Sequence, residues 1–182
     1  MGKFKTRHVK KIRNVSFGEA IVLGFRNTFV LSGRAQRAEY WWFTLFCLLG
    51  DIATVGFDGL VATVFRSEWW GQVSPLGWAF YVITFTPSLT LLGRRLHDVG
   101  KSDLWLLAWL AFLTLPSLFA LLPISLTIEM FRFLSSIPSP VLTICAFLTV
   151  SILIYIFVLT LMDSEKDDNR YGPSVKYIFH EG

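Results

Sequence analysis

Charged residues are scarce in this sequence of 182 residues. Only 16% are Asp, Glu, Lys or Arg, and 53% are apolar. An ordinary soluble domain has about a quarter of its residues charged. The scarcity of charge therefore argues against a water-soluble domain and indicates a membrane protein.

Cysteine and histidine are also rare. Cys47 and Cys145 both lie within apolar runs, which argues against a disulfide framework and indicates buried free thiols. His97 has no second histidine near it, and His8 and His180 lie in the terminal tails, whereas metal sites gather three or four matched ligands. We therefore expect neither a metal nor a cofactor.

An apolar run just after a short basic start, as found in signal peptides, is missing. The first 13 residues hold six Lys or Arg, and a serine follows soon after. We therefore expect no cleaved leader, and we treat residues 1–15 as a basic N-terminal tail.

Four apolar runs are long enough to cross a membrane as helices, for which about 20 mostly apolar residues are needed. Short polar segments separate the runs, so they form two hairpins. The sequence thus predicts an all-α integral membrane protein, with one membrane domain over residues 16–162 and a C-terminal tail over 163–182. The expected spans cover approximately residues 40–65, 75–93, 104–125 and 139–162.

The distribution of Lys and Arg predicts the orientation, because cytoplasmic flanks carry the excess of these residues. Residues 1–39, the connection 94–103 and the C-terminal tail together hold fifteen, whereas the other two connections hold only Arg66 and Arg132. This asymmetry predicts a multi-pass membrane protein of four helices with both termini in the cytoplasm.

A short amphipathic helix is expected before the first span, in the segment SFGEAIVLGFRNTF. Ser16 and Glu19 have the spacing of a capping box, and Phe17, Phe25 and their neighbours at helical spacing share one face. Two placements are open at this stage: the face dips into the headgroup layer at the cytoplasmic surface, or it packs onto the protein's own base.

The segment LLGRRLHDVGKS, residues 91–102, resembles a phosphate-binding loop only at its end. That loop needs a glycine where Arg95 stands, and no strand precedes it. The segment is better explained as a hairpin turn, in which cations meet the negative end of a helix dipole and Gly100 closes the helix. Arg94 and Asp98 are four residues apart, so on a helix they share a face and could pair.

A second basic segment, SGRAQRAEYWWF, precedes the first span and is expected at the same cytoplasmic level. Guanidinium groups bind phosphates and carboxylates bidentately, so these clusters predict a site for anionic headgroups or for a protein partner. The alternative is that they only orient the protein and pair with its own acids. The expected partners are membrane lipids, a protein partner or further copies of the chain, but not nucleic acid. The candidate binding residues are Arg34, Arg37, Glu39, Arg94, Arg95, His97, Asp98, Asn169 and Tyr171.

Two further hypotheses stay open. Asp51 and Asp58 lie inside the first expected span, where charged groups are costly, so a small transporter or channel using both is the main alternative. A membrane-embedded enzyme with His97 as base and Asp98 as its partner is a weaker one, because adjacent helical residues point in different directions.

Three segments resemble the bacterial membrane protein family called domain of unknown function 805. They are SFGEAIVLGFRNTFVLSGRAQRAEYWWF, GRRLHDVGKSDLW and DNRYGP. The resemblance implies a small inner-membrane protein with four helices, and it implies no established activity. The matching positions are Gly33, Arg34, Arg37, Glu39, Tyr40, Trp41, Arg94, Arg95, Leu96, His97, Asp98, Gly100, Ser102, Asn169, Tyr171, Gly172 and Pro173.

Overall fold

The computed structural model describes residues 7–108, 110, 126, 129, 132–133 and 135–181. The chain divides into two compact units, one formed by Met1–Lys101 with Met162–Gly182 and the other by Ser102–Leu161. The elements are β1 (Arg7–Ile12), α1 (Phe17–Arg26), α2 (Arg37–Val64), α3 (Glu68–Val73), α4 (Pro75–Asp98), α7 (Ser139–Leu161) and β2 (Tyr177–Glu181).

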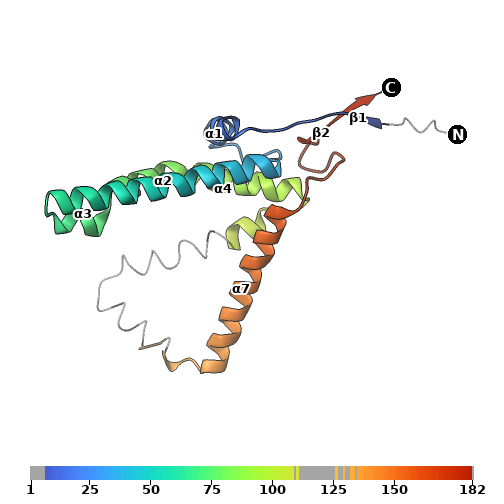
Figure 1. The fold of residues 1–182 in the computed structure, drawn as a ribbon. Helices are drawn as coiled ribbons and strands as arrows, with labels where there is room; N and C mark the ends of the chain where they lie inside the picture. The colour runs from blue at the N-terminus through green and yellow to red at the C-terminus, as the bar shows by residue number, and fades with distance from the viewer. Residues whose placement is uncertain are drawn as a thin grey trace. The chain divides into compact units, whose positions relative to one another are not determined.

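Helices α2 and α4 form a close hairpin in the first unit (Figure 1). Gly50 on α2 permits the close approach, because a side chain there would meet the ring of Phe80 on α4 at 2.1 Å. The same ring contacts Phe46, with ring centroids 5.7 Å apart. The short helix α3 closes the far end of the hairpin and begins at Ser67, whose hydroxyl accepts a hydrogen bond from the Trp70 amide.

Helix α1 packs across the N-terminal part of α2 and is seen almost along its axis in Figure 1. Ser16 caps it, as the sequence predicts, by accepting a hydrogen bond from the amide of Glu19 at 3.3 Å. Gly24 lies directly over the ring of Phe43, and Phe25 packs edge-on against the same ring. The predicted face therefore packs onto the protein's own α2, which is the second of the two expected placements.

The two tails pair as a small antiparallel ribbon, which was not predicted from the sequence. In β1 and β2, Val9 lies opposite Phe179. The amide of Arg13 continues the ladder by donating to the carbonyl of Lys176 at 2.9 Å. Each strand has only five or six residues, so neither is distinguishable from a polar tail by its own pattern.

Helix α4 extends beyond the predicted end of its span at Gly93, so the GRRLHD segment is helical. The predicted stop at Gly100 is confirmed: this residue has φ +71°, and the amide of Lys101 donates back to the carbonyl of Leu96. The basic segment thus forms the last turn and a half of a membrane-length helix.

Within the described part of the chain, three helices have the length and apolar composition to cross a membrane. They are α2, α4 and α7, and they match three of the four expected spans. Of the expected span over 104–125, only residues 104–108 and 110 are described, and these are helical; the rest lies outside the described residues. In the second unit, the rings of Trp105 and Tyr155 contact each other with centroids 4.6 Å apart.

Candidate functional site

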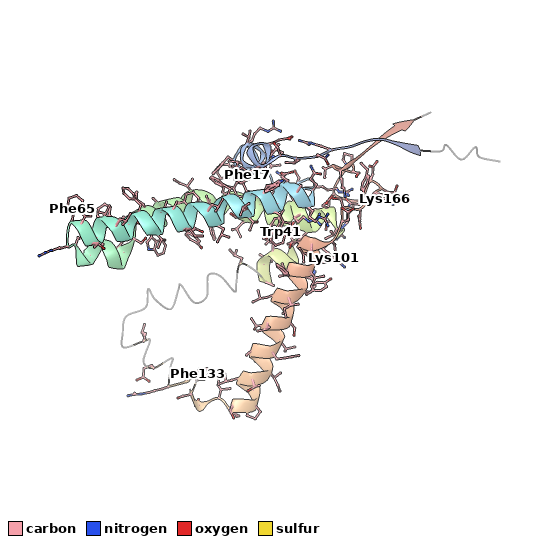
Figure 2. The ribbon with its side chains drawn as sticks, in the orientation of Figure 1. Phe17, Trp41, Phe65, Lys101, Phe133 and Lys166 are labelled. Carbon is pink, nitrogen blue, oxygen red and sulfur yellow. The ribbon has the colours of Figure 1, made fainter. Side chains whose placement is uncertain are left out.

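The two arginine segments meet at one end of the α2–α4 hairpin. Figure 2 places Trp41, Lys101 and Lys166 toward this end and Phe65 at the opposite end. The charged side chains that gather here are buried, and we call them the arginine cluster: Arg34, Glu39, Arg94, Arg95 and Asp98.

Asp98, the last residue of α4, is the shared acceptor of the arginine cluster. Its Oδ1 accepts from Nε of Arg34 at 3.0 Å, and its Oδ2 accepts from Nη1 of Arg95. The three side chains have no exposed surface. A buried carboxylate that balances two guanidinium groups is strongly held, because removing one partner leaves an uncompensated charge.

Glu39 and Arg94 form a second buried ion pair, which joins the first turn of α2 to the turn of α4 before its last one. The expected pair between Arg94 and Asp98 is therefore wrong. Helical spacing allows that pair, but Asp98 takes Arg95 and Arg34 instead, and Arg94 reaches the acid on the neighbouring helix.

The C-terminal tail after α7 is held against the arginine cluster through its backbone. Arg34 donates to the carbonyl oxygens of Glu165, Asp167 and Gly172, at 2.7, 2.9 and 3.4 Å. Arg95 donates to the carbonyl of Met162. Each guanidinium group has five N–H donors. Those of Arg34 and Arg95 satisfy backbone carbonyls of the tail that would otherwise lack donors in a buried site.

His97 and two residues of the NRYGP segment add to this attachment. The imidazole of His97 stacks on Tyr171 with centroids 3.8 Å apart, and its Nδ1 lies 3.1 Å from the carbonyl oxygen of Gly33. The amide of Asn169 donates to the carbonyl of His97 and to the carboxylate of Glu165. All three predicted segments are therefore in contact here.

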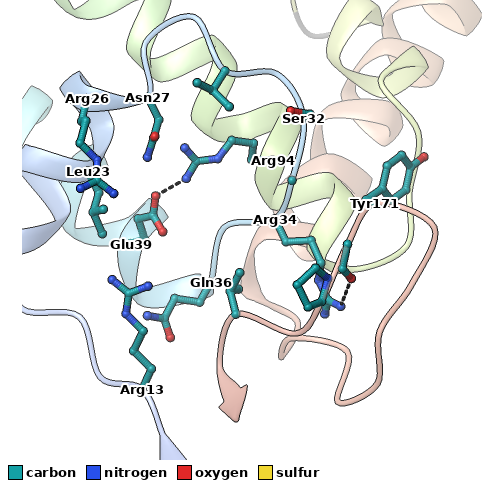
Figure 3. A pocket seen from close by; sticks show the side chains of 15 residues that line it. Arg13, Leu23, Arg26, Asn27, Ser32, Arg34, Gln36, Glu39, Arg94 and Tyr171 are labelled. Atoms are coloured by element: carbon teal, nitrogen blue, oxygen red, sulfur yellow. Dashed lines mark hydrogen bonds and ion pairs between the residues drawn. The ribbon is translucent and has the colours of Figure 1, made fainter. Parts of the chain in front are cut away.

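A pocket of about 310 Å³ opens beside the arginine cluster (Figure 3). Four of the nine predicted binding residues line it, namely Arg34, Glu39, Arg94 and Tyr171. The other five do not line it: Arg37, Arg95, His97, Asp98 and Asn169. The other polar side chains of its wall were not predicted, because no spacing or charge pattern within the quoted segments marks them as binding residues. These are Arg13, Arg26, Asn27, Ser32 and Gln36.

Two polar side chains of this pocket, Gln36 and Arg26, are not engaged by a partner among the described residues. Gln36 is only 3% exposed, and its side chain makes no hydrogen bond within the described part of the chain. Arg26, in the last turn of α1, is exposed and forms no ion pair with the residues that the structure describes. Arg13 is half-exposed and pairs with Glu19 at 2.7 Å. The pocket thus offers amide and guanidinium donors at its edge.

The two aspartates of α2 have different surroundings. Asp58 is 1% exposed and accepts three hydrogen bonds, from the indole of Trp70, the hydroxyl of Ser74 and the amide of Gly77, at 2.8 to 3.0 Å. It therefore anchors α3 and the start of α4 to α2. Asp51 is exposed and lines a separate cavity.

The C-terminal tail, outside the candidate spans, holds one acid whose pKa is strongly lowered, Asp163. The ammonium of Lys176 and the hydroxyl of Tyr177 both donate to Asp163, which lowers the pKa of this carboxyl to about 2. Among the described residues, no group of three or more His, Cys, Asp or Glu is arranged to hold a metal ion.

Comparison with known proteins gives a family and two curated relatives. The family described as "Protein of unknown function (DUF805)" matches residues 28–173. The "Inner membrane protein YhaI" of Escherichia coli strain K12 and that of Escherichia coli O157:H7 are each 36% identical to this chain over 83 residues. The match covers 45% of this chain and 63% of each relative, so it spans less than two thirds of their length. No solved structure gives a significant match.

The family match includes both arginine segments and the NRYGP tail, the three segments that meet at the arginine cluster. The three candidate spans agree with a multi-pass membrane protein. The chain belongs to the DUF805 family.

Proposed function

We propose that this chain is a four-span inner-membrane protein that binds the phosphate group of an anionic lipid in the pocket beside the arginine cluster. The observation that carries the proposal is the composition of that pocket. Four arginines line it against one carboxylate, Glu39, which Arg94 already neutralises. Arg13 pairs with Glu19, and Arg34 shares Asp98 with Arg95, so the five arginines in and beside the pocket outnumber the three acids that they contact.

The donors available to a ligand are those not already committed to the protein's own acids and carbonyls. Arg34 and Arg94 hold Asp98 and Glu39, so they contribute charge more than hydrogen bonds. Arg26 and the half-exposed Arg13 can turn toward a phosphate, and the buried amide of Gln36 supplies a further donor. Guanidinium groups suit phosphate because their donors match its geometry bidentately.

Apolar side chains beside the pocket favour a lipid over a soluble phosphate. The chain leaving α1 exposes Phe29 by 87% and Leu31 by 54%, directly after Asn27 in the pocket wall. Tyr40 and Trp41 begin α2 nearby, and such aromatic residues favour the boundary between membrane and water. A lipid bound here would place its phosphate at the arginines and its chains along this apolar loop.

Chain connectivity supports a fourth span. The chain leaves the first unit after Lys101 and re-enters it at Met162, and both residues adjoin the arginine cluster. Since α7 is one candidate span, a return to the same side of the membrane requires a second crossing between residues 102 and 138. The pairing of the two tails supports the proposal that both termini lie on one side, and the basic residues favour the cytoplasm as that side.

Native mass spectrometry of the full chain tests the lipid proposal. Protein exchanged into equal mixtures of phosphatidylglycerol and phosphatidylcholine should retain phosphatidylglycerol preferentially. The double variant Arg13→Gln with Arg26→Gln should retain at least fivefold less of it. The matched control, Lys101→Gln with Arg132→Gln, changes the net charge equally but alters no pocket residue, and should behave as the wild type.

Two outcomes would contradict the proposal. Equal loss of phosphatidylglycerol in both double variants would mean that net charge alone retains the lipid. Binding of soluble glycerol phosphate without any preference for phosphatidylglycerol would assign the pocket to a soluble anion and remove the membrane source.

A further inference from the structure

A second cavity, of about 360 Å³, lies on the α2–α4 hairpin, between the middle of α2 and the first turns of α4. Asp51 is about 14 residues from the start of α2, which corresponds to roughly 21 Å along the helix axis. This cavity is therefore far from the arginine cluster. Its lining residues are Asp51, Val55, Ser74, Gly77, Trp78 and Tyr81.

Asp51 is the one charged side chain among these lining residues. The hydroxyl of Ser74 and the amide of Gly77 both donate to Asp58, so they are engaged. The Asp51 carboxylate is exposed and makes no hydrogen bond or ion pair within the described part of the chain. A carboxylate inside a membrane span is costly unless a cation or a polar partner compensates its charge.

Two aromatic rings stand beside this carboxylate. Trp78 and Tyr81, one helical turn apart on α4, contact each other edge to face with ring centroids 6.0 Å apart. Both rings are exposed, and both line the cavity. The face of an aromatic ring attracts cations, most strongly in tryptophan. The cavity thus combines one negative charge with apolar and aromatic walls.

The same features decide which class of cation fits. A divalent metal requires several oxygen ligands at short range, and the lining residues supply one free carboxylate. A monovalent organic cation needs only one counter-ion, and it can bury its apolar body against the rings and Val55. We propose that this cavity binds a lipophilic organic cation, with Asp51 as counter-ion and with Trp78 and Tyr81 as its aromatic wall.

This site is independent of the anionic-lipid pocket, and its test uses a different probe. Equilibrium dialysis of tetraphenylphosphonium against the full chain in detergent micelles, with empty micelles as blank, should give saturable binding. Asp51→Asn should weaken that binding at least tenfold. Binding of the neutral triphenylphosphine oxide should change less than twofold, because it has no charge for the carboxylate to balance.

A matched carboxylate change serves as control. Glu129→Gln alters an exposed acid whose ion-pair partner among the described residues is Arg132, and it should leave tetraphenylphosphonium binding unchanged. Trp78→Leu should weaken binding severalfold. Equal affinity of wild type and Asp51→Asn, or the lack of saturable binding by the wild type, would overturn the proposal.

Cysteine labelling tests whether the cavity is open in the intact protein. In a Cys47→Ser, Cys145→Ser background, Asp51→Cys should react with a cationic methanethiosulfonate, since the wild-type aspartate is exposed. An unreactive cysteine would show that another part of the protein fills the cavity, and this would also overturn the proposal.

Discussion

Arg34 and Asp98 are 64 residues apart in the sequence and form a fully buried ion pair of 3.0 Å. Arg34 precedes α2, and Asp98 is the last residue of α4, so this contact joins the entry to the hairpin with its exit. Because Arg34 also holds three carbonyls of the C-terminal tail, one side chain connects three distant segments. The same cluster that shapes the pocket thus organises the fold.

Asp98→Asn should destabilise the protein strongly, because it leaves the buried guanidinium groups of Arg34 and Arg95 without a counter-charge. Removing one partner of a buried pair costs about 3–5 kcal/mol. The free energy of unfolding, measured by denaturant titration in detergent micelles, should fall by that amount. Asp167→Asn is the matched control: Arg34 contacts only its carbonyl, so its stability should change by less than about 0.5 kcal/mol.

The attachment of the tail gives a second prediction. Arg34→Gln removes the donors that hold the carbonyls of Glu165 and Asp167, so the tail should detach more often. Trypsin should then cleave faster after Lys166 and Arg170, which are exposed, and cleavage by a protease tracks the population of the open form. Unchanged cleavage rates in a folded Arg34→Gln protein would contradict this role.

The pair between Glu39 and Arg94 can be isolated by a double-mutant cycle. Glu39→Gln and Arg94→Gln should each lower the free energy of unfolding by several kcal/mol, because each leaves the other charge buried and alone. The double variant should lose much less than the sum of the two, which gives a coupling energy above about 1 kcal/mol. Additive losses would mean that the two side chains act independently.

The sequence predicted the helices well where their bounds depend on residues close together in the chain. Three spans, the Ser16 cap and the stop at Gly100 follow from apolar run length, capping chemistry and the conformational freedom of glycine. Partner choice was not predictable in the same way. Helical spacing favours an ion pair between Arg94 and Asp98. In the fold, Arg94 instead pairs with Glu39, which lies 55 residues earlier on another helix.

The pocket shows a second limit of sequence patterns. The spacing of the arginines predicts that Arg34 and Arg94 share one layer, but nothing in the pattern marks Gln36 or Arg26 as pocket residues. Arg26 reaches the pocket because α1 packs across α2, and Gln36 does so as the residue that precedes α2. The hypothesis that Asp51 and Asp58 act together met a similar limit. A spacing of seven indicates a shared helix face, but it does not reveal that Trp70, Ser74 and Gly77 engage Asp58.

Asp58→Asn should lower stability through loss of acceptor capacity. The carboxylate serves three donors with two oxygens, whereas an amide has one acceptor oxygen and presents an NH2 group toward the other donors. An unsatisfied buried donor costs about 1–3 kcal/mol, so the free energy of unfolding should fall within that range. Asp51→Asn on the same helix should change it little, and equal losses in the two variants would contradict the anchoring role of Asp58.

The ion pair between Asp163 and Lys176 predicts a pH dependence of tail attachment. The pKa of Asp163 is lowered to about 2 from its ordinary value of 3.8, so the folded tail favours the ionised carboxylate. This contribution is fully present above about pH 4 and is lost as pH falls from about 4 to 2, where Asp163 is protonated in the folded state too. Because the carboxylate is half-exposed, the effect should stay below about 1 kcal/mol. Trypsin is inactive in this range, so the intrinsic fluorescence of Tyr177, isolated by difference from a Tyr177→Phe variant, should report it. In wild type this signal should change between pH 4 and 2. In Asp163→Asn it should stay constant, since no carboxylate remains there to titrate. A change of equal size in both proteins would assign the pH dependence to another group.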